Sequence, residues 1–375
     1  MPGQSAHVWR VRDIAEMIEE WAPLTLAAEW DKVGLQTGRG DSAVQQVLLT
    51  VDGTDTVIEE AAAIGAQLIV AHHPLLLAPI TAVTDACPAP RRALRLCEEG
   101  IAYYAAHTNL DAAPVDSTSD VLVKHLGLPG SVRPLGTGTA LPAVKLVTFV
   151  PQGHEDAVFA AMASAGAGRI GNYSSCSFRA RGVGTFLSEE GTQPAVGQRG
   201  QFETVEEVRL ETVVPSWCLG SAVRAMIGAH PYEEVAYDVF AMERQASGSP
   251  FARLVTLPSA MPFSELVGRV REQAGGAVCV AGAEETRVER VAVCAGGGAS
   301  VIVEAAACGA QAMVTGECGH HDALKALDCG LALILMGHHA SERPVLEILA
   351  RRLSARFGET LEVTVSSSDR GPFAG

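Results

Sequence analysis

Two adjacent histidines at the end of an apolar segment are the first residues in this chain whose types and spacing could do chemistry. The run 67–71 has the composition of a buried strand, His72 and His73 follow it directly, and Pro74 bars the strand from continuing. Successive side chains on a strand point to opposite faces, so one metal ion could hardly take both imidazoles there. At a frayed strand end the two could serve two neighbouring ions. The alternative is that one histidine is packed and the other solvated.

Histidines paired with carboxylates recur at the ends of two other predicted strands. His107 is followed four residues later by Asp111, and His338 by Glu342, a spacing that puts both members on one face of a helical turn. Two imidazoles and a carboxylate suit zinc, iron or manganese, and extra carboxylates favour a pair of ions. Two divalent cations about 3.5–4 Å apart repel each other, so they need anionic bridges. Asp111 and Glu342 are the natural candidates for such bridges.

Other residues near these strand ends could assist. His107 or His321 could carry a proton, because imidazole titrates near neutral pH. Asp31 could orient an imidazole or cap a helix, and the sequence favours the cap. Any single histidine could also be a cap or a core residue, but three clusters at equivalent positions favour a site. The full set of candidates is His72, His73, His107, Asp111, His320, His321, His338, His339 and Glu342, with the participation of Cys318 and His320 left open.

The elements that must position these residues occur twice. In the first half, a strand at 46–51, a helix at 56–64 and the strand before His72 form a β-α-β unit. Such a unit implies a parallel sheet with ligands at the carboxyl ends of its strands. Residues 47–70 align without a gap with residues 291–314, and the strand at 330–336 repeats the one at 100–106. We therefore expect two quasi-equivalent lobes, joined in one pseudo-symmetric α/β domain that brings both sets of strand ends to one cleft.

The middle of the chain has a different pattern. Residues 144–243 predict the order β-α-β followed by β-α-β, which is typical of a ferredoxin-like α+β domain inserted between the lobes. The segments 129–142 and 246–249 are predicted to be linkers, because they are rich in small and turn-forming residues. The expected domains are lobe 1 at 1–135, the insert at 140–245 and lobe 2 at 250–375.

Two glycine- or proline-containing turns have more than one interpretation. Gly296-Gly297-Gly298 precedes a predicted helix and could cradle a phosphate with backbone N–H groups, but a tight turn explains it equally well. The segment His230-Pro231-Tyr232-Glu233-Glu234 lies at a helix-to-strand corner of the middle region, where we favour a structural turn.

Composition restricts the function classes. The chain has 375 residues, 48% of them hydrophobic and 19% charged, which is long enough for two or three globular domains. Its net charge of −15 argues against nucleic acid as the main partner, since phosphate backbones need clustered lysine and arginine. No apolar run approaches a membrane span and the N-terminus lacks signal-peptide features, so a cytoplasmic protein is expected. Nine cysteines without a Cys-x-x-Cys pair are interpreted mostly as small buried hydrophobes.

Taken together, the motifs resemble those of the Nif-three-like dinuclear metal-centre family, whose members are often called GTP cyclohydrolase 1 type 2 homologues. The resemblance covers nearly the whole chain, including the insert, which resembles the PII/CutA-like domain of the family's long form. It implies that two divalent ions are held by His72, His73, Asp111, His338 and Glu342, with His107 beside them, in a toroidal homohexamer. Lys32 and the segment 115–118 depart from the family pattern at the rim of the pocket. The motifs are Trp30-Asp31-x-x-Gly34-Leu35, His72-His73-Pro74-Leu75, His107-Thr108-Asn109-Leu110-Asp111, Gly337-His338-His339-Ala340-Ser341-Glu342 and His230-Pro231-Tyr232-Glu233.

Two functions from different classes follow as expectations. The first is a metal-dependent hydrolase that acts on a small molecule, either GTP, with attack on the ring carbon C8 and loss of formate, or another nucleotide or phosphate ester. His107 and His321 are the predicted catalytic residues. The second is a non-catalytic metal-binding scaffold or metallochaperone, in which the same ligands hold ions without turnover.

Overall fold

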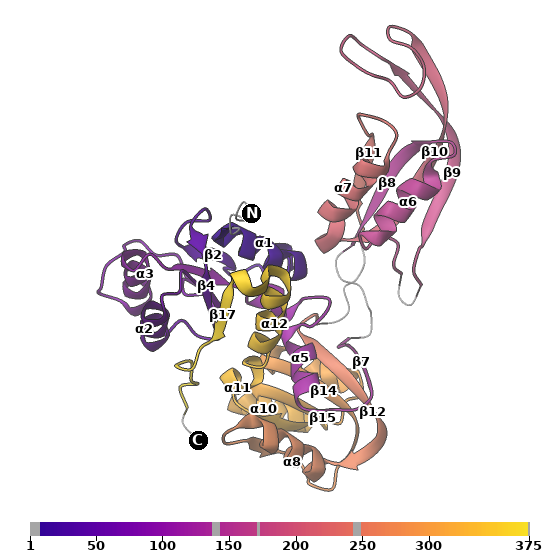
Figure 1. Cartoon of the computed structure of the whole chain (residues 1–375). Coiled ribbons are helices and arrows are strands. Elements are labelled where there is room, and N and C mark those ends of the chain that lie inside the picture. Colours follow the sequence, from indigo (N-terminus) through magenta and orange to yellow (C-terminus); the bar gives the residue numbers. More distant parts are fainter. Residues whose placement is uncertain (1–7, 137–142, 171–172, 243–248, 374–375) are drawn as a thin grey trace. The chain divides into compact units, whose positions relative to one another are not determined.

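The computed structural model describes residues 8–136, 143–170, 173–242 and 249–373 (Figure 1). The chain divides into two compact units, one formed by Met1–Thr137 with Gly248–Gly375 and the other by Gly138–Ser247. The second unit spans nearly the range 140–245 expected for an insert. Within the described ranges, no helix combines the length and the apolar character that a membrane span requires.

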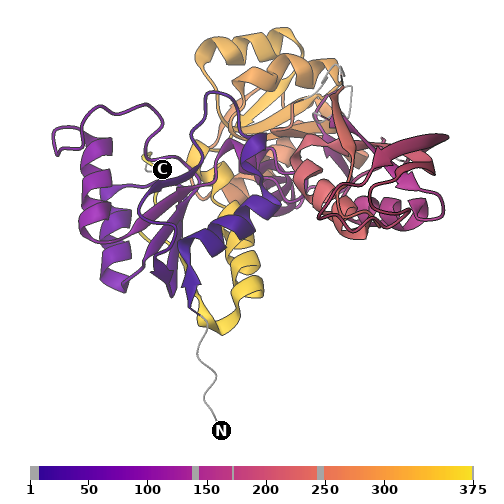
Figure 2. The same cartoon turned by 90° about the horizontal axis from the view of Figure 1, so that it is seen from above.

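The first sheet of the larger unit is built around four adjacent parallel strands. Its interior strands are buried on both sides, because α1 (Val11–Trp21) and α12 (Val345–Phe357) cover one face and α2 (Asp55–Ile64) and α3 (Pro88–Glu98) cover the other (Figure 2). Only the edge strand β2 is antiparallel to its neighbour. In sheet order the strands are β17 (Glu362–Val365), β4 (Gln46–Thr50), β5 (Leu68–Ala71), β6 (Ala102–Ala105) and β2 (Gly34–Thr37).

The second sheet of the same unit has three adjacent parallel strands, β14, β15 and β16, which are flanked by antiparallel strands. α5 (Thr118–His125) and α8 (Phe263–Ala274) pack on one face, and α9 (Ile302–Ala307) with α10 (His320–Asp328) packs on the other. In sheet order the strands are β13 (Cys279–Ala281), β16 (Ala332–Leu335), β15 (Ala312–Glu317), β14 (Arg287–Gly297), β12 (Ala252–Pro262) and β7 (Ser131–Pro134).

The ladder registers of the two sheets repeat the alignment seen in the sequence. Val47 pairs with Leu68 in the first sheet, and Val291 pairs with Ala312 in the second, so both strands keep the offset between 47–70 and 291–314. The third strands pair equivalently with the second ones. The internal repeat is therefore a repeat of structure.

A pair of glutamines explains why part of the repeat is so similar. The side chain of Gln67 accepts hydrogen bonds from the N–H groups of Gln45 and Gln46 (2.8 and 3.0 Å) and donates to the carbonyl of Gly65. Gln311 makes the same three bonds, with the N–H groups of Glu289 and Arg290 (3.1 and 2.8 Å) and the carbonyl of Gly309. Each glutamine ties the start of one strand to the helix end before the next. Gly65 and Gly309 both have the positive φ angle that ends such a helix.

The lobes do not end where the sequence suggested. The segment 129–142 was expected to be a linker, but β7 (131–134) pairs with β12 and extends the second sheet. All four residues of β7 are exposed, so the strand has no apolar alternation that could have revealed it. α5 packs on the second sheet, whereas α12 and β17 from the C-terminal part complete the first. The two lobes thus exchange elements across the predicted boundaries at 135 and 250.

The smaller unit is an antiparallel sheet with two helices on one face. Its elements follow the order β-α-β-β-α-β and its strands the order β11-β8-β10-β9, the arrangement of a ferredoxin-like fold. β9 has a polar, glycine-rich sequence in which no residue is buried, so its side chains show no apolar pattern. The elements are β8 (Ala143–Pro151), α6 (Glu155–Ser164), β9 (Ser177–Leu187), β10 (Phe202–Pro215), α7 (Leu219–Ala229) and β11 (Tyr237–Ala241).

The cysteines differ from the expectation that most are buried. Only Cys218, Cys294 and Cys308 are buried, and all nine are free thiols. The others lie mainly at helix ends and in short edge elements, where sequence composition says little about exposure.

Candidate metal centre

Six side chains meet at the carboxyl ends of the parallel strands in the larger unit. His72 and His73 directly follow β5, and His107 follows β6. The remaining three lie on short helices, since Asp111 ends α4 (Thr108–Asp111) and His338 and Glu342 begin and end α11 (His338–Glu342). The structure thus brings the five ligands predicted from the sequence to one place, together with His107.

The carboxylate of Glu342 lies at the middle of this cluster. Its Oε1 is 3.1 Å from His338 Nε2 and 3.6 Å from His72 Nε2, and its Oε2 is 3.2 Å from His73 Nε2. The same Nε2 atom of His72 is also 3.6 Å from Asp111 Oδ1. Glu342 therefore faces imidazoles from both sheets, as a bridging ligand must.

The Nδ1 atom of each of the four imidazoles is held by an oxygen that can only accept a hydrogen bond at neutral pH. Each Nδ1 therefore carries a proton, and each Nε2 is the ring nitrogen directed at the cluster, able to ligate an ion once any proton on it is displaced. This is the orientation that ligation by Nε2 needs, and outer acceptors of this kind raise the basicity of a ligand. The acceptors are the carbonyl of Ala106 for His72 (2.8 Å), Asp52 for His73 (2.9 Å), Asp31 for His107 (2.9 Å) and Glu317 for His338 (3.0 Å).

Three of these acceptors are carboxylates, and the sequence had suggested only Asp31 among them as a residue that could orient an imidazole. Asp31 was interpreted as a helix cap; it accepts from the backbone N–H of Thr108 at the start of α4 (3.0 Å), but it also orients His107. Asp52 and Glu317 follow β4 and end β15, respectively. The rule that polar residues at parallel strand ends share one edge, which selected His72, would have found both.

The cluster contains buried polar atoms that an ion would satisfy. The ring of His72 is 2% exposed, and its Nε2 has no hydrogen-bond partner among the described residues; Glu342, 4% exposed, has an oxygen in the same condition. An unpaired buried polar group costs free energy, and in a native protein it usually has a partner. Two groups of side chains here could hold an ion, namely His72 with His73 and His107, and His73 with His338 and Glu342. The donor set fits a pair of divalent cations.

Comparison with known proteins then places the chain. The model of the family Duf34/NIF3 (NGG1p interacting factor 3) matches residues 9–372. The chain belongs to this family.

Similar proteins extend over the full length of this NIF3 member. It is 36% identical to proteins called "GTP cyclohydrolase 1 type 2 homolog" from Halalkalibacterium halodurans, over 364 residues, and Bacillus subtilis, over 368 residues. In both comparisons the alignment covers 96% of this chain and 97% of the relative. Among solved structures, a Bacillus cereus protein related to NIF3 superposes with a TM-score of 0.81 at 34% identity, covering 98% of this chain and 100% of that one.

The electrostatics of this NIF3 cluster favour positive charge between its acids. Burial by itself lowers the pKa of His73, but Asp52 and Glu342 outweigh it and raise the pKa to about 10. Hydrogen bonding to Glu342 raises the pKa of His338 to about 9. Burial opposes ionisation of Glu342, yet the neighbouring imidazoles, His72 foremost, hold its pKa well below the usual value. A cluster without ions thus holds protons that arriving cations must displace.

Glycines on the second sheet let the chain approach Glu342 closely. Gly296 has a φ of +68°, and a Cβ there would collide with the Glu342 carboxylate. A Cβ on Gly316 would lie 2.6 Å from Ser341 Oγ and 2.8 Å from His338 Cα. These contacts favour the tight-turn interpretation of the run beginning at Gly296 over a phosphate cradle.

The C-terminal segment supports the site from behind. Asp369 is 4% exposed, and its carboxylate accepts a hydrogen bond from Val51 N (2.8 Å) and lies 3.1 Å from His339 Nε2. Val51 immediately precedes Asp52, the residue that orients His73. Arg343 adds an ion pair to Asp369 at 3.2 Å, so His339 and Asp369 form a structural contact next to the cluster rather than a vacant set of ligands.

The remaining sequence candidates lie apart from the cluster. His320 and His321 are exposed at the start of α10, with ring centroids 5.4 Å apart. Cys318 is half-buried against the core of the second sheet. None of these three belongs to a group of described residues that could hold an ion. A catalytic role for His321 stays a prediction without support from these contacts.

A cavity of about 510 Å³ opens beside the cluster. His73 and His338 form part of its wall, together with Asp52 and Glu317. Residues 274–277 and 371–373 also line it. A small molecule bound there would reach two of the imidazoles whose Nε2 atoms face Glu342.

Proposed function

We propose that this NIF3 member binds two divalent metal ions at the cluster and hydrolyses a small molecule in the adjacent cavity. The observation that carries the proposal is the position of Glu342, whose two oxygens face Nε2 atoms of His72, His73 and His338. His72, Asp111 and Glu342 would hold one ion, and His73, His338 and Glu342 the other. Zinc, iron and manganese all accept such nitrogen and oxygen donors.

The ions, when bound, would polarise the bond to be cleaved and lower the pKa of water to near neutrality. The chain contributes the rest. Asp52 and Glu317 keep the Nε2 atoms of His73 and His338 pointing inward, so no side-chain rearrangement is needed when substrate arrives. His107 lies beside His72 and His73, with ring centroids 5.2 and 5.3 Å away, and is the residue we propose to move a proton.

The printed names of the relatives make GTP the first substrate to examine, with water adding at ring carbon C8 and formate leaving. The cavity itself favours a second candidate. No lysine or arginine is among the described residues that line it, so phosphate groups would be bound by the ions alone. A compact phosphate ester, with one phosphate on the ions and little beyond it, fits such a cavity better than a triphosphate.

Metal analysis of protein purified without added metal, followed by assays for formate from GTP and for phosphate from a panel of nucleotides and esters, tests the proposal. We expect two ions per chain and turnover that disappears in His73→Ala. In His107→Ala we expect both ions to remain while turnover falls; loss of an ion instead would make His107 a ligand. Two bound ions without turnover on any substrate would favour a metal-binding scaffold or metallochaperone.

Two further expectations stay predictions. Assembly as a toroidal homohexamer follows from the resemblance, and light scattering of the purified chain would test it. The cytoplasmic location rests on sequence composition and would be tested by fractionating cells.

A further inference from the structure

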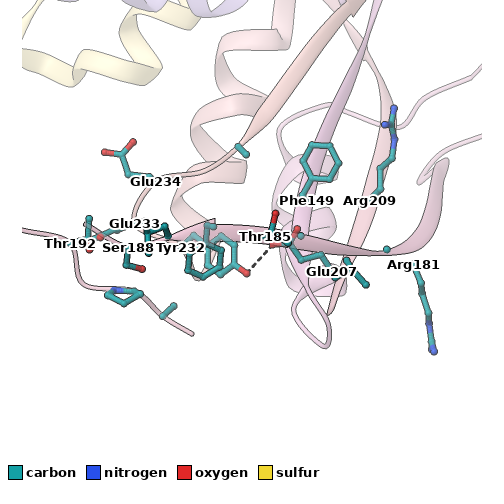
Figure 3. A pocket seen from close by; sticks show the side chains of 18 of the residues that line it. Phe149, Arg181, Thr185, Ser188, Thr192, Glu207, Arg209, Tyr232, Glu233 and Glu234 are labelled. Atoms are coloured by element: carbon teal, nitrogen blue, oxygen red, sulfur yellow. Dashed lines mark hydrogen bonds between the residues drawn. The ribbon is translucent and has the colours of Figure 1, made fainter. Parts of the chain in front are cut away.

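The smaller unit contains a cavity on the face of its sheet opposite the two helices. Its volume is about 600 Å³, enough for a small organic molecule. Phe149 from β8 and Tyr232 from the turn before β11, both labelled in Figure 3, supply aromatic walls together with Phe186 from β9. The rings of Phe186 and Tyr232 meet edge to face, with centroids 6.2 Å apart. The walls are therefore suited to a flat ring.

The floor of this cavity is bare because β9 has small residues there. Ala180, Gly182 and Gly184 alternate along the face that pairs with Glu207 and Arg209 on β10. A Cβ built on Gly182 would meet nothing within 4 Å, so that position is open space. At Gly184, by contrast, a Cβ would collide with the carboxylate of Glu207. The sequence Gly-Val-Gly thus leaves room for a ligand and room for Glu207 to reach it.

Glu207 is the polar group at the centre of the cavity. Its Oε1 accepts a hydrogen bond from the phenol of Tyr232 (2.9 Å), as Figure 3 shows. Burial, and then this contact with Glu207, raise the pKa of Tyr232, so the phenol keeps its proton and stays a donor. One oxygen of Glu207 is held in this way, and the carboxylate is left with acceptor capacity toward the open floor.

The two arginines that line the cavity do not neutralise Glu207. The guanidinium of Arg209 bonds to Glu211 (2.8 Å) and lies over the ring of Phe149, 5.9 Å from its centroid. Arg181 belongs to the alternate register of β9, on the side of Arg179, which pairs with Asp156 of α6. Figure 3 shows its side chain directed away from Tyr232. The cavity therefore presents an uncompensated carboxylate among aromatic rings.

The rim is braced rather than loose. The N–H of Gln193 donates to the carboxylate of Glu233 (2.7 Å), which ties the loop after β9 to the turn before β11. His230, predicted to belong to a structural turn, accepts from the N–H of Tyr232 (3.1 Å) and contacts the carbonyl of Phe149 (3.1 Å). These bonds hold the turn that carries Tyr232.

We propose that this cavity is a binding site for a small planar aromatic molecule that carries an amino or amidino group. The ring would lie on the Gly182 floor against Phe149, Phe186 and Tyr232, and the N–H donors would bond to Glu207. This site shares no residue with the metal cluster, and the proposal does not depend on the proposed hydrolase activity.

Benzamidine and benzoate form a matched pair of probes, with nearly the same shape and opposite charge. Ligand-observed NMR and calorimetric titration of the full-length protein should show saturable binding of benzamidine with a Kd on the order of 1 mM, as suits so small a ligand. Benzoate should bind at least about tenfold more weakly, because its carboxylate would face Glu207.

Two variants test the site from different sides. Glu207→Gln removes the charge and Gly182→Leu fills the floor, and each should weaken benzamidine binding at least about tenfold. Glu206→Gln removes a neighbouring charge from the opposite face of β10 and should leave binding unchanged. Circular dichroism would establish that the variants are folded. No saturable binding, equal binding of benzoate, or unchanged binding in folded Glu207→Gln and Gly182→Leu would overturn the proposal.

Discussion

The two sheets of the larger unit have equivalent strand registers, but residues at equivalent positions in them have different roles at the metal cluster. With the offset that aligns 47–70 with 291–314, His73 corresponds to Glu317 and Asp52 corresponds to Gly296. In the first sheet, Asp52 orients His73, whose Nε2 faces the cluster. In the second, Glu317 orients His338, and Gly296 is small so that Glu342 can come close.

The comparison teaches that duplication preserved the backbone frame and not the ligand set. A parallel strand that ends at the common edge delivers whatever side chain follows it to the cleft. One copy delivers His72 and His73 there, while the other delivers a glycine, Gly316, and the orienting acid Glu317. The centre depends on both copies because the ligand facing both sides, Glu342, comes from the second.

The largest effect on metal binding is expected from substitution of Glu342, the residue of the second copy that faces imidazoles from both sheets. Glu342→Gln keeps the shape but removes the charge opposite three imidazoles, so we expect metal affinity to fall by more than about 100-fold, beyond the effect of an orienting residue. Metal content per chain, measured by mass spectrometry after dialysis, should drop below one ion. Glu347→Gln, an exposed residue of α12, is the control for loss of one charge. Two ions retained in Glu342→Gln would refute the shared-ligand role.

Asp52 and Glu317 sharpen the comparison between the copies. Asp52→Asn and Glu317→Gln should each lower the affinity for the ion near His73 and His338 by about 10–100-fold. The loss should be larger for Asp52, because its side chain is 34% exposed while that of Glu317 is 57% exposed. Competitive chelator titrations would measure both affinities. Equal and negligible effects would mean that the imidazoles are oriented by packing alone.

Gly296 tests whether the second copy needs its small residue. Gly296→Ala places a side chain at φ +68° and against Glu342, which we expect to lower the free energy of unfolding by roughly 1–2 kcal/mol from the backbone alone. Gly297→Ala is the matched control, because a Cβ there meets nothing within 4 Å. Thermal unfolding of metal-free protein would compare the two. An equal Tm for both variants would count against the close approach.

The pH dependence of metal affinity follows from the raised pKa values of His73, about 10, and His338, about 9. Below these values the metal-free imidazoles are protonated, so each ion must displace protons, and affinity rises as the pH rises toward 9. For each proton displaced, the expected slope is about tenfold per pH unit. Metal titrations between pH 6 and pH 8, a range that includes the pKa of about 6.5 of free histidine, would measure this slope. A flat profile would show that the imidazoles are already neutral.

The local sequence pattern was sufficient to predict the parallel strands of the two sheets and the residues that follow them. The apolar run before His72 and the exact offset between the copies are visible in the sequence because parallel strands are buried on both faces and each copy keeps its core residues. The strand-end candidates, which include the five residues that the resemblance implies as ligands, were found in the same way. Each of these five stands within seven residues of a strand end.

Pairing partners far apart in sequence could not be found that way. β7 and β9 have exposed side chains on both faces, so nothing in their composition distinguishes them from loops. The exchange of α5 and α12 between the lobes depends on which sheet each helix packs against, and amphipathic spacing does not reveal that. Asp369 supports the site through a contact with Val51, more than three hundred residues away in sequence.

A crystal structure of the metal-loaded protein, with anomalous scattering recorded at the absorption edge of the bound metal, tests the central claim most directly. We predict two anomalous peaks that both contact Glu342, one beside His72 and Asp111 and the other beside His73 and His338. A single peak, or two peaks that do not share Glu342, would contradict it.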